Sequence, residues 1–105
     1  MFARVTLFEI DTLRIGMDAA LERFKEQILP IMEKQEGYQG SYVMDTPEGK
    51  GLLVTFWATE AAAQAGIESG YYDEQISKFV SFFRAPAGRE NYEVVFEDSP
   101  SKAAI

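Results

Sequence analysis

Neither cysteine nor histidine occurs anywhere in the 105-residue chain. Disulfide bonds and thiol nucleophiles are therefore excluded, together with Ser-His triads and metal sites built on thiolate or imidazole ligands. Only carboxylate, phenol and carbonyl oxygens remain as ligands for a hard cation such as magnesium or calcium. Because the choice of metal ligands is reduced to these oxygens, we expect no metal site.

Basic residues are also few, with 10 Lys and Arg against 17 Asp and Glu and a net charge of −7. This balance disfavours nucleic acid and acidic membrane surfaces, because binding to either needs a basic face. The apolar start, residues 1–10, is too short to span a membrane and is interrupted by Arg4 and Glu9. It is typical of a strand rather than a signal peptide, and we expect a cytoplasmic protein.

The composition is that of an ordinary globular protein, with 47% hydrophobic and 26% charged residues. The length suits one domain that can bury a core without a metal or a disulfide. We predict a single domain over residues 1–97 and a flexible, polar C-terminal tail over residues 98–105.

Hydrophobic periodicity predicts four strands and two helical regions. Strands are expected over residues 2–10, 38–46, 52–58 and 89–97. A first helix is expected over residues 15–35, bent or loosened by Pro30. A second helix is expected to start after a Thr59 cap, to break near Gly70, to resume near Asp73 and to end before Pro86.

The resulting βαββαβ order predicts an α+β, ferredoxin-like fold with two helices on one face of an antiparallel sheet. The glycine-containing loop at residues 47–51 makes the second and third strands antiparallel neighbours. Right-handed crossovers lead us to expect the first and third strands side by side and parallel at the sheet centre.

Both faces of the two central strands are apolar. One face carries Ala3, Val5, Leu7, Leu52, Val54 and Phe56, and the other carries Phe2, Thr6, Phe8, Leu53, Thr55 and Trp57. Two helices can cover one face only, so the other would expose an apolar patch on the order of several hundred Å². We predict a homodimer formed through this face; a monomer with a few exposed hydrophobic residues is the alternative.

Four short motifs occur in a characteristic order between residues 2 and 97: Phe2-Ala3-Arg4-Val5, Leu29-Pro30, Glu36-Gly37-Tyr38-Gln39-Gly40 and Phe56-Trp57-Ala58-Thr59-Glu60-Ala61. Through them the sequence resembles the dimeric α/β-barrel superfamily, specifically its antibiotic-biosynthesis-monooxygenase-like branch. The resemblance implies a cleft between helices and sheet that holds a flat aromatic substrate. It also implies that oxygen reacts there without a metal, flavin or other cofactor.

The sequence departs from active relatives in two respects. Val5 and Thr6 stand where such enzymes often have an asparagine, and the second helix has no histidine that could bind heme. The leading interpretation is a small-molecule-binding domain, a cofactor-independent monooxygenase acting on a phenolic or polycyclic compound. The alternative is a non-catalytic dimeric barrel that binds a ligand or a partner protein, for example in a stress response.

Six side chains are predicted to bind the substrate: Trp57, Tyr72, Tyr71, Arg4, Thr6 and Tyr42. No catalytic residue is identified.

Each of these side chains also has a purely structural interpretation. Trp57 can stack on a ligand or simply pack, and Tyr71 and Tyr72 can offer phenol donors or close the gap beside Gly70. Arg4 is charged in an otherwise apolar strand, so its side chain needs a carboxylate partner, solvent or an anionic ligand. We expect the first or the second of these: an ion pair, or exposure to solvent at the sheet rim.

Strand alternation predicts that three hydroxyls point toward the pocket, those of Thr6, Tyr42 and Thr55. The alternative is that each forms a hydrogen bond to a nearby group of the chain. A free volume of a few hundred Å³ beside Trp57 would favour binding, and its filling by side chains would favour packing.

Overall fold

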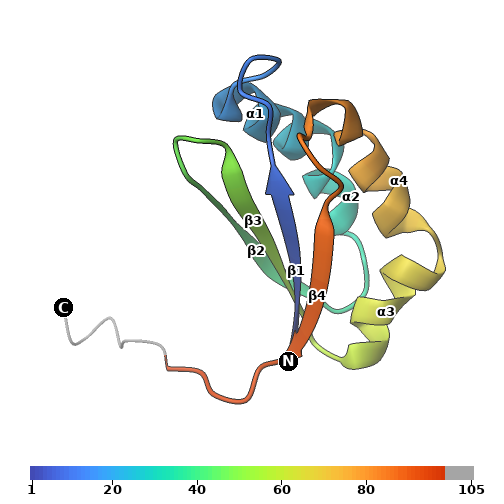
Figure 1. Cartoon of the computed structure of the whole chain (residues 1–105). Coiled ribbons are helices and arrows are strands. Elements are labelled where there is room, and N and C mark those ends of the chain that lie inside the picture. Colours follow the sequence, from blue (N-terminus) through green and yellow to red (C-terminus); the bar gives the residue numbers. More distant parts are fainter. Residues whose placement is uncertain (99–105) are drawn as a thin grey trace.

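The computed structural model of the protein describes residues 1–98 and shows one sheet with helices on one side (Figure 1). This is the predicted α+β, ferredoxin-like architecture. No helix in this part of the chain is long and apolar enough to cross a membrane. The elements follow in the order β1 (Phe2–Glu9), α1 (Met17–Gln27), α2 (Leu29–Met32), β2 (Tyr38–Asp45), β3 (Lys50–Trp57), α3 (Glu60–Glu68), α4 (Tyr71–Ser77), the 3₁₀ turn η1 (Val80–Phe82) and β4 (Gly88–Glu93).

The sheet has the strand order β2-β3-β1-β4, and all neighbouring strands are antiparallel. The prediction that β1 and β3 are central neighbours is confirmed, but the predicted parallel direction is wrong. The crossover through α1 and α2 brings β2 back parallel to β1, with one strand position between them. The hairpin then reverses β3, which fills that position and runs antiparallel to both.

The expected long first helix is divided into two. α1 ends at Gln27, Ile28 has φ −112° and ψ −50°, and α2 begins at Leu29 with Pro30 in its first turn. A proline at the start of a helix leaves no hydrogen bond unmade, because the first amide groups have no partner within the helix. The loosening predicted at Pro30 therefore takes the form of a break just before it.

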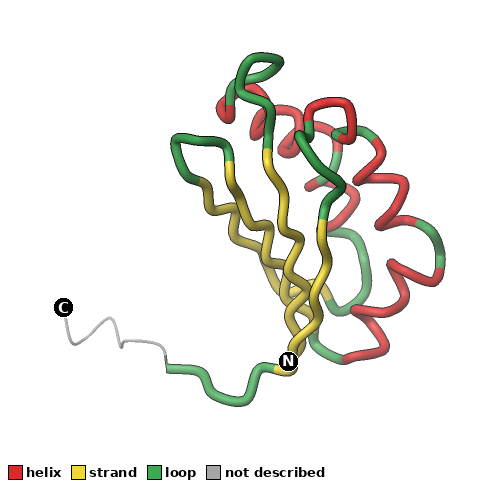
Figure 2. Tube along the Cα trace, in the orientation of Figure 1, coloured by secondary structure: helices red, strands yellow, loops and turns green. Residues whose placement is uncertain are grey.

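The second helical region follows the sequence closely. The Thr59 hydroxyl accepts a hydrogen bond from the Ala62 amide at 3.0 Å, which is the predicted cap. Gly70, with φ +82°, separates α3 from α4, and α4 begins at Tyr71 rather than near Asp73. This break turns the chain between two short helices that both lie over the sheet (Figure 2).

The fourth strand is shorter than the expected range of 89–97. It ends at Glu93, which pairs with Phe2, the first residue of β1. Beyond it, the Val94 amide donates a hydrogen bond to the Met1 carbonyl at 2.8 Å. Of the predicted tail at residues 98–105, all but Asp98 lies outside the described residues.

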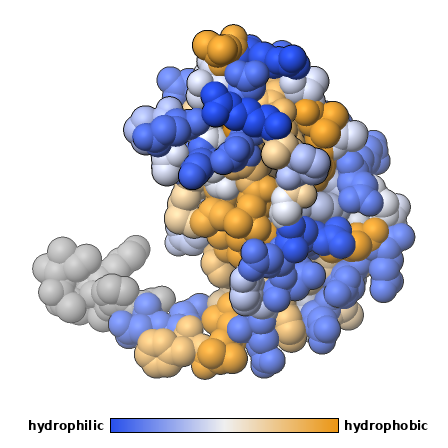
Figure 3. All heavy atoms as spheres, viewed as in Figure 1, coloured by the Kyte–Doolittle hydropathy of each residue, from blue (hydrophilic) through white to orange (hydrophobic). Residues whose placement is uncertain are grey.

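The core lies between the helices and one face of the sheet. Its buried residues come from both helical parts of the chain, from the end of β3 and from the segment between β1 and α1: Ile10, Ile15, Ala20, Ile28, Met32, Trp57, Ala63 and Phe79. The opposite face carries exposed large side chains, including Leu7, Tyr42, Met44 and Tyr92. The prediction that helices cover only one face is thus confirmed. Figure 3 shows apolar side chains gathered over the strands, next to strongly hydrophilic ones over the helices.

Two glycines with the same backbone conformation differ in their surroundings, and this gives a matched pair of variants. Gly37 and Gly70 have φ +83° and φ +82°, but an added Cβ would lie 2.5 Å from the Ala62 Cβ at Gly37 and would meet nothing within 4 Å at Gly70. We expect Gly70→Ala to lower the free energy of unfolding by about 1–2 kcal/mol from backbone strain alone. Gly37→Ala should cost about 1–3 kcal/mol more through overpacking.

Urea denaturation of both variants measures this difference. Equal losses of unfolding free energy would show that the contact between Gly37 and α3 relaxes without cost.

Candidate functional site

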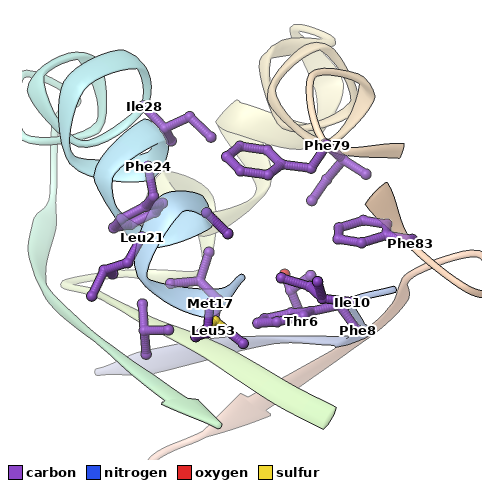
Figure 4. Close-up of a pocket in the computed structure, with 13 residues that line it drawn as sticks. Thr6, Phe8, Ile10, Met17, Leu21, Phe24, Ile28, Leu53, Phe79 and Phe83 are labelled. Carbon is purple, nitrogen blue, oxygen red and sulfur yellow. The ribbon is translucent and has the colours of Figure 1, made fainter. Parts of the chain in front are cut away.

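An apolar cleft opens between α1, the η1 segment and the helix-facing side of the sheet. Figure 4 shows side chains of α1 on one wall, two phenylalanines of the η1 region on the opposite wall, and strand residues on the floor. The lining residues are Thr6, Phe8, Ile10, Met17, Ala20, Leu21, Phe24, Ile28, Val43, Leu53, Ile76, Phe79 and Phe83. Thr6 carries the only side-chain hydroxyl among them.

The cleft is narrow. It contains about 530 Å³ of space between atoms, counting the solvent at its mouth, but only about 70 Å³ is wide enough for the centre of a water molecule. A polycyclic ligand therefore fits only if the walls of the cleft separate.

A second, more polar cavity lies next to the cleft. Four residues line both: Thr6, Ile28, Leu53 and Ile76. The remaining lining residues of this cavity, here called the polar end, are Arg4, Met32, Thr55, Trp57, Tyr71, Tyr72 and Gln75. The polar end has about 400 Å³ between atoms, including open solvent, and about 40 Å³ of room for water. Side chains fill most of the space beside Trp57, so the free volume there is smaller than that expected of a ligand pocket.

Arg4 occupies the centre of the polar end. Its side chain projects from β1 toward the helices, is 4% exposed, and lies between the rings of Trp57 and Tyr72 at 5.1 and 5.0 Å from their centroids. One guanidinium nitrogen, Nη2, donates a hydrogen bond to the Ala63 carbonyl of α3, while Nε has no partner. The predicted ion pair or rim exposure is wrong, since β1 is a central strand and α3 covers this residue.

Two hydrogen-bonded pairs of side chains complete the polar end. The hydroxyls of Thr6 and Tyr72 are 2.7 Å apart, and either can be the donor. The Trp57 indole N–H donates to the Thr55 hydroxyl at 2.9 Å. The first pair joins the floor of the cleft to α4, so a ligand oxygen that replaces one of its members would be held at the junction of the two cavities.

Tyr71 lies at the margin of this cavity. Its hydroxyl lies 3.5 Å from the Ile28 carbonyl, which is a long and weak hydrogen bond. Burial raises the pKa of the Tyr71 phenol, and the nearby Glu74 carboxylate adds to the shift. The phenol is therefore a proton donor rather than a base at neutral pH.

The structure brings four of the six predicted site residues together: Arg4, Thr6, Trp57 and Tyr72. Tyr71 lines the same cavity at its edge. Tyr42 is placed elsewhere, because its side chain is 66% exposed on the opposite face of the sheet, against the ring of Phe56. The reason is an irregularity in the pairing of β2 between Tyr38 and Gly40, which reverses the alternation of side chains beyond it.

Sequence reasoning missed Gln75 and gave the apolar stripe of α1 no part in the site. Gln75 is buried, and its side-chain oxygen accepts a hydrogen bond from Lys78 Nζ at 2.9 Å. Its spacing of four residues from Tyr71 and three from Tyr72 is the signal that could have placed it on the same helix face. The apolar stripe of α1 predicted an amphipathic helix, and its residues Met17, Leu21 and Phe24 line the cleft.

The polar end offers hydrogen-bond donors and a cation but no histidine, and residues 1–98 contain no cluster of acidic side chains that could hold a metal ion. Donors and a cation of this kind can hold and polarise an oxygen-bearing group. A substrate that ionises or oxidises readily by itself suits such a site, because the site supplies orientation and positive charge rather than a strong base.

Comparison with known proteins adds the fold family. No family model matches the chain, and no curated protein matches it significantly. A Nitrosomonas europaea protein of unknown function aligns over 95% of this chain and 94% of its own, with TM-score 0.70 and 19% identity.

Two oxygenases are similar in structure as well. A Streptomyces coelicolor monooxygenase in complex with nanaomycin D, from the ActVA-Orf6 gene, has TM-score 0.74 and 13% identity over 95% of this chain and 92% of its own. SnoaB, a cofactor-independent oxygenase from Streptomyces nogalater, has TM-score 0.72 and 9% identity over 91% and 94%. Identities this low show the fold alone: the chain has an antibiotic-biosynthesis-monooxygenase-like fold.

Proposed function

We propose that this protein binds a hydrophobic aromatic molecule in the cleft, with the rings against the apolar walls and a polar substituent at the Thr6–Tyr72 pair. One observation carries the proposal: the apolar cleft and the polar end share Thr6, so a single flat ligand can contact both. In this arrangement Trp57 and Arg4 lie behind the hydroxyl pair, and Tyr71 borders the ligand at the margin. Tyr42 takes no part.

The proposed activity is cofactor-independent monooxygenation of a phenolic or anthrone-like compound. In such a reaction a ring CH₂ group and O₂ give a C=O group and water, so that the substrate itself supplies the electrons. The part of the protein is to orient the substrate, exclude water and favour its anionic form by nearby positive charge. The two oxygenases of the same fold support this activity.

The second candidate is a non-catalytic dimeric barrel that binds a ligand or a partner protein. The packing of the polar end favours it, since side chains fill most of the space beside Trp57. The two candidates share the cleft and differ in whether oxygen is consumed there.

We also propose that the protein is a cytoplasmic homodimer, each chain folding as one domain over residues 1–97. The uncovered face of the sheet supports pairing, because nine apolar side chains project from it: Ala3, Val5, Leu7, Tyr42, Met44, Leu52, Val54, Phe56 and Tyr92. Val95 and Phe96, on the segment that leads away from the helices after β4, are also highly exposed (Figure 1). A second copy would bury both groups.

Binding is tested by quenching of Trp57 fluorescence, since this is the only tryptophan in the chain. We expect 1-naphthol, anthrone or 1,4-naphthoquinone to quench it saturably. Any compound that binds is then followed with an oxygen electrode. Oxygen uptake that depends on the protein supports the monooxygenase, and binding without uptake supports the non-catalytic barrel.

Two matched variants locate the binding site. Leu21→Phe enlarges a side chain in the cleft wall and should weaken binding at least about tenfold by excluding the ligand. Leu13→Phe makes the same change at a side chain that is 94% exposed and should leave binding as it is. If no compound in the panel quenches, or if Leu21→Phe binds as tightly as the wild type, the cleft is not the binding site.

A further inference from the structure

We propose that the ligand of the cleft is an anion, an aromatic compound with an ionised oxygen group that the Arg4 guanidinium neutralises. This inference rests on the proposed function and adds the charge of the ligand to it. Its basis is that the charge of Arg4 has no counter-ion within the described part of the molecule.

The charge balance around Arg4 is unusual for a buried cation. Both ion pairs among residues 1–98, Arg14 with Asp11 and Lys25 with Glu22, lie elsewhere. No carboxylate of these residues therefore lies within 4.0 Å of the Arg4 guanidinium. Buried charges are normally paired, because removing a charge from water without compensation is costly.

The aromatic rings compensate this charge only in part. Trp57 and Tyr72 attract the guanidinium through cation–π contacts, but such contacts engage the faces of the guanidinium. Its N–H groups project from the edge, where Nη2 is bonded to Ala63 and Nε is without a partner. An oxygen anion is the partner that this edge fits best, since N–H groups in a planar fork match a carboxylate.

A second cation adds to the positive potential. Arg89, on β4, lies over the Tyr72 ring at 5.1 Å, so that two guanidinium groups contact the same ring. Burial lowers the pKa of Arg4, Tyr72 opposes the shift, and Arg89 adds to the lowering. An anion between the cleft and Arg4 would relieve this repulsion. The site is thus locally positive in a protein whose net charge is −7.

The position of Arg4 indicates how a ligand would reach it. Thr6 lies two residues further along β1, faces the same side of the sheet, and lines both cavities. Rings held in the apolar cleft would therefore direct a charged substituent past Thr6 toward the guanidinium. Separation of Tyr72 from the Thr6 hydroxyl would open this route.

A matched pair of probes tests the charge of the ligand. Naphthalene-2-carboxylate and naphthalene-2-carboxamide have the same ring system and nearly the same shape, and only the first is charged at pH 7. We expect calorimetry to show that the full-length protein binds the carboxylate about tenfold to a hundredfold more tightly, as is typical of a charge-assisted hydrogen bond.

Two variants assign the preference to Arg4. Arg4→Met keeps much of the side-chain volume and removes the charge, and it should bring the affinity for the carboxylate down to that for the amide. Lys25→Met removes the same charge from an exposed position on α1 and should leave the preference unchanged. Circular dichroism checks that both variants are folded.

The outcomes separate this inference from the proposed function. If both probes bind with similar affinity to the wild type, the anion preference is overturned while the cleft remains a ligand site. The same holds if a folded Arg4→Met variant keeps the preference. If neither probe binds, the proposed function fails and the inference fails with it. The comparison of the two probes on the wild type is decisive even if Arg4→Met does not fold.

Discussion

Replacing Trp57 with alanine is expected to lower the free energy of unfolding by about 3–5 kcal/mol, the range found when large aromatic side chains are removed from cores. Trp57 is 1% exposed, which makes it the most buried large side chain of the described residues. The change would remove its edge contact with Tyr38, its hydrogen bond to Thr55 and the ring that faces Arg4. The loss of this ring would leave the buried guanidinium with one aromatic neighbour instead of two.

Urea denaturation followed by circular dichroism measures this effect, since the variant has no tryptophan fluorescence. Unfolding should be compared at one protein concentration, because a dimer gains stability with concentration. Trp57→Phe keeps a ring and should lose less stability, and Leu13→Ala, at an exposed position, should stay within about 0.5 kcal/mol of the wild type. A Trp57→Ala variant within about 1 kcal/mol of the wild type would mean that the polar end closes around the gap, and would contradict the tight packing described above.

Replacing Val54 with aspartate is expected to convert the proposed dimer into a monomer. Val54 is central in the uncovered face, opposite Val5 on β1 and Tyr42 on β2. In a sheet-to-sheet dimer the new carboxylate would be buried twice, once from each chain, near the twofold axis and without a cation. We expect the dissociation constant to rise at least about a hundredfold, since each buried unpaired charge costs several kcal/mol.

Sedimentation velocity at micromolar concentration distinguishes the two states. The wild type should sediment as a dimer and Val54→Asp as a folded monomer, because in a monomer this face is exposed to water and tolerates a charge. Gln27→Asp introduces the same charge at an exposed position of α1 and should remain a dimer. A wild type that sediments as a monomer, or a Val54→Asp variant that stays dimeric, would rule out pairing through this face.

Local sequence signals placed most of the elements correctly. Thr59 with Ala61 and Ala62 behind it predicted the start of α3, and Gly70 predicted the break before α4. These signals work because a cap hydroxyl or a positive φ acts within a few residues of its position in the chain. The end of β4 was predicted less accurately, because a strand ends where the neighbouring strand no longer pairs with it, and the local sequence does not show that position.

The candidate site was predicted only in part. Thr6 and Trp57 were assigned to one face of the sheet by alternation, which holds along β1 and β3, whereas Arg4 was named as a site residue but expected in an ion pair or at the sheet rim. Tyr42 was assigned to that face too, but the irregularity near Gly40 turned it to the other side. No residue pattern in the sequence indicated this irregularity, since it depends on how β2 pairs with β3.

The sequence by itself determined the order of strands and helices, the apolar character of both sheet faces and the absence of thiol and imidazole chemistry. Those properties depend on residue type and on spacing within a few positions. The tertiary structure alone decided that β1 and β3 are antiparallel, that the stripe of α1 lines a cleft, and that Arg4 is buried between two rings without a carboxylate. The reason is physical: direction, enclosure and charge balance arise from segments far apart in the chain, such as β1 and α4, whose Thr6 and Tyr72 are 66 residues apart, and no local pattern specifies which of their side chains meet.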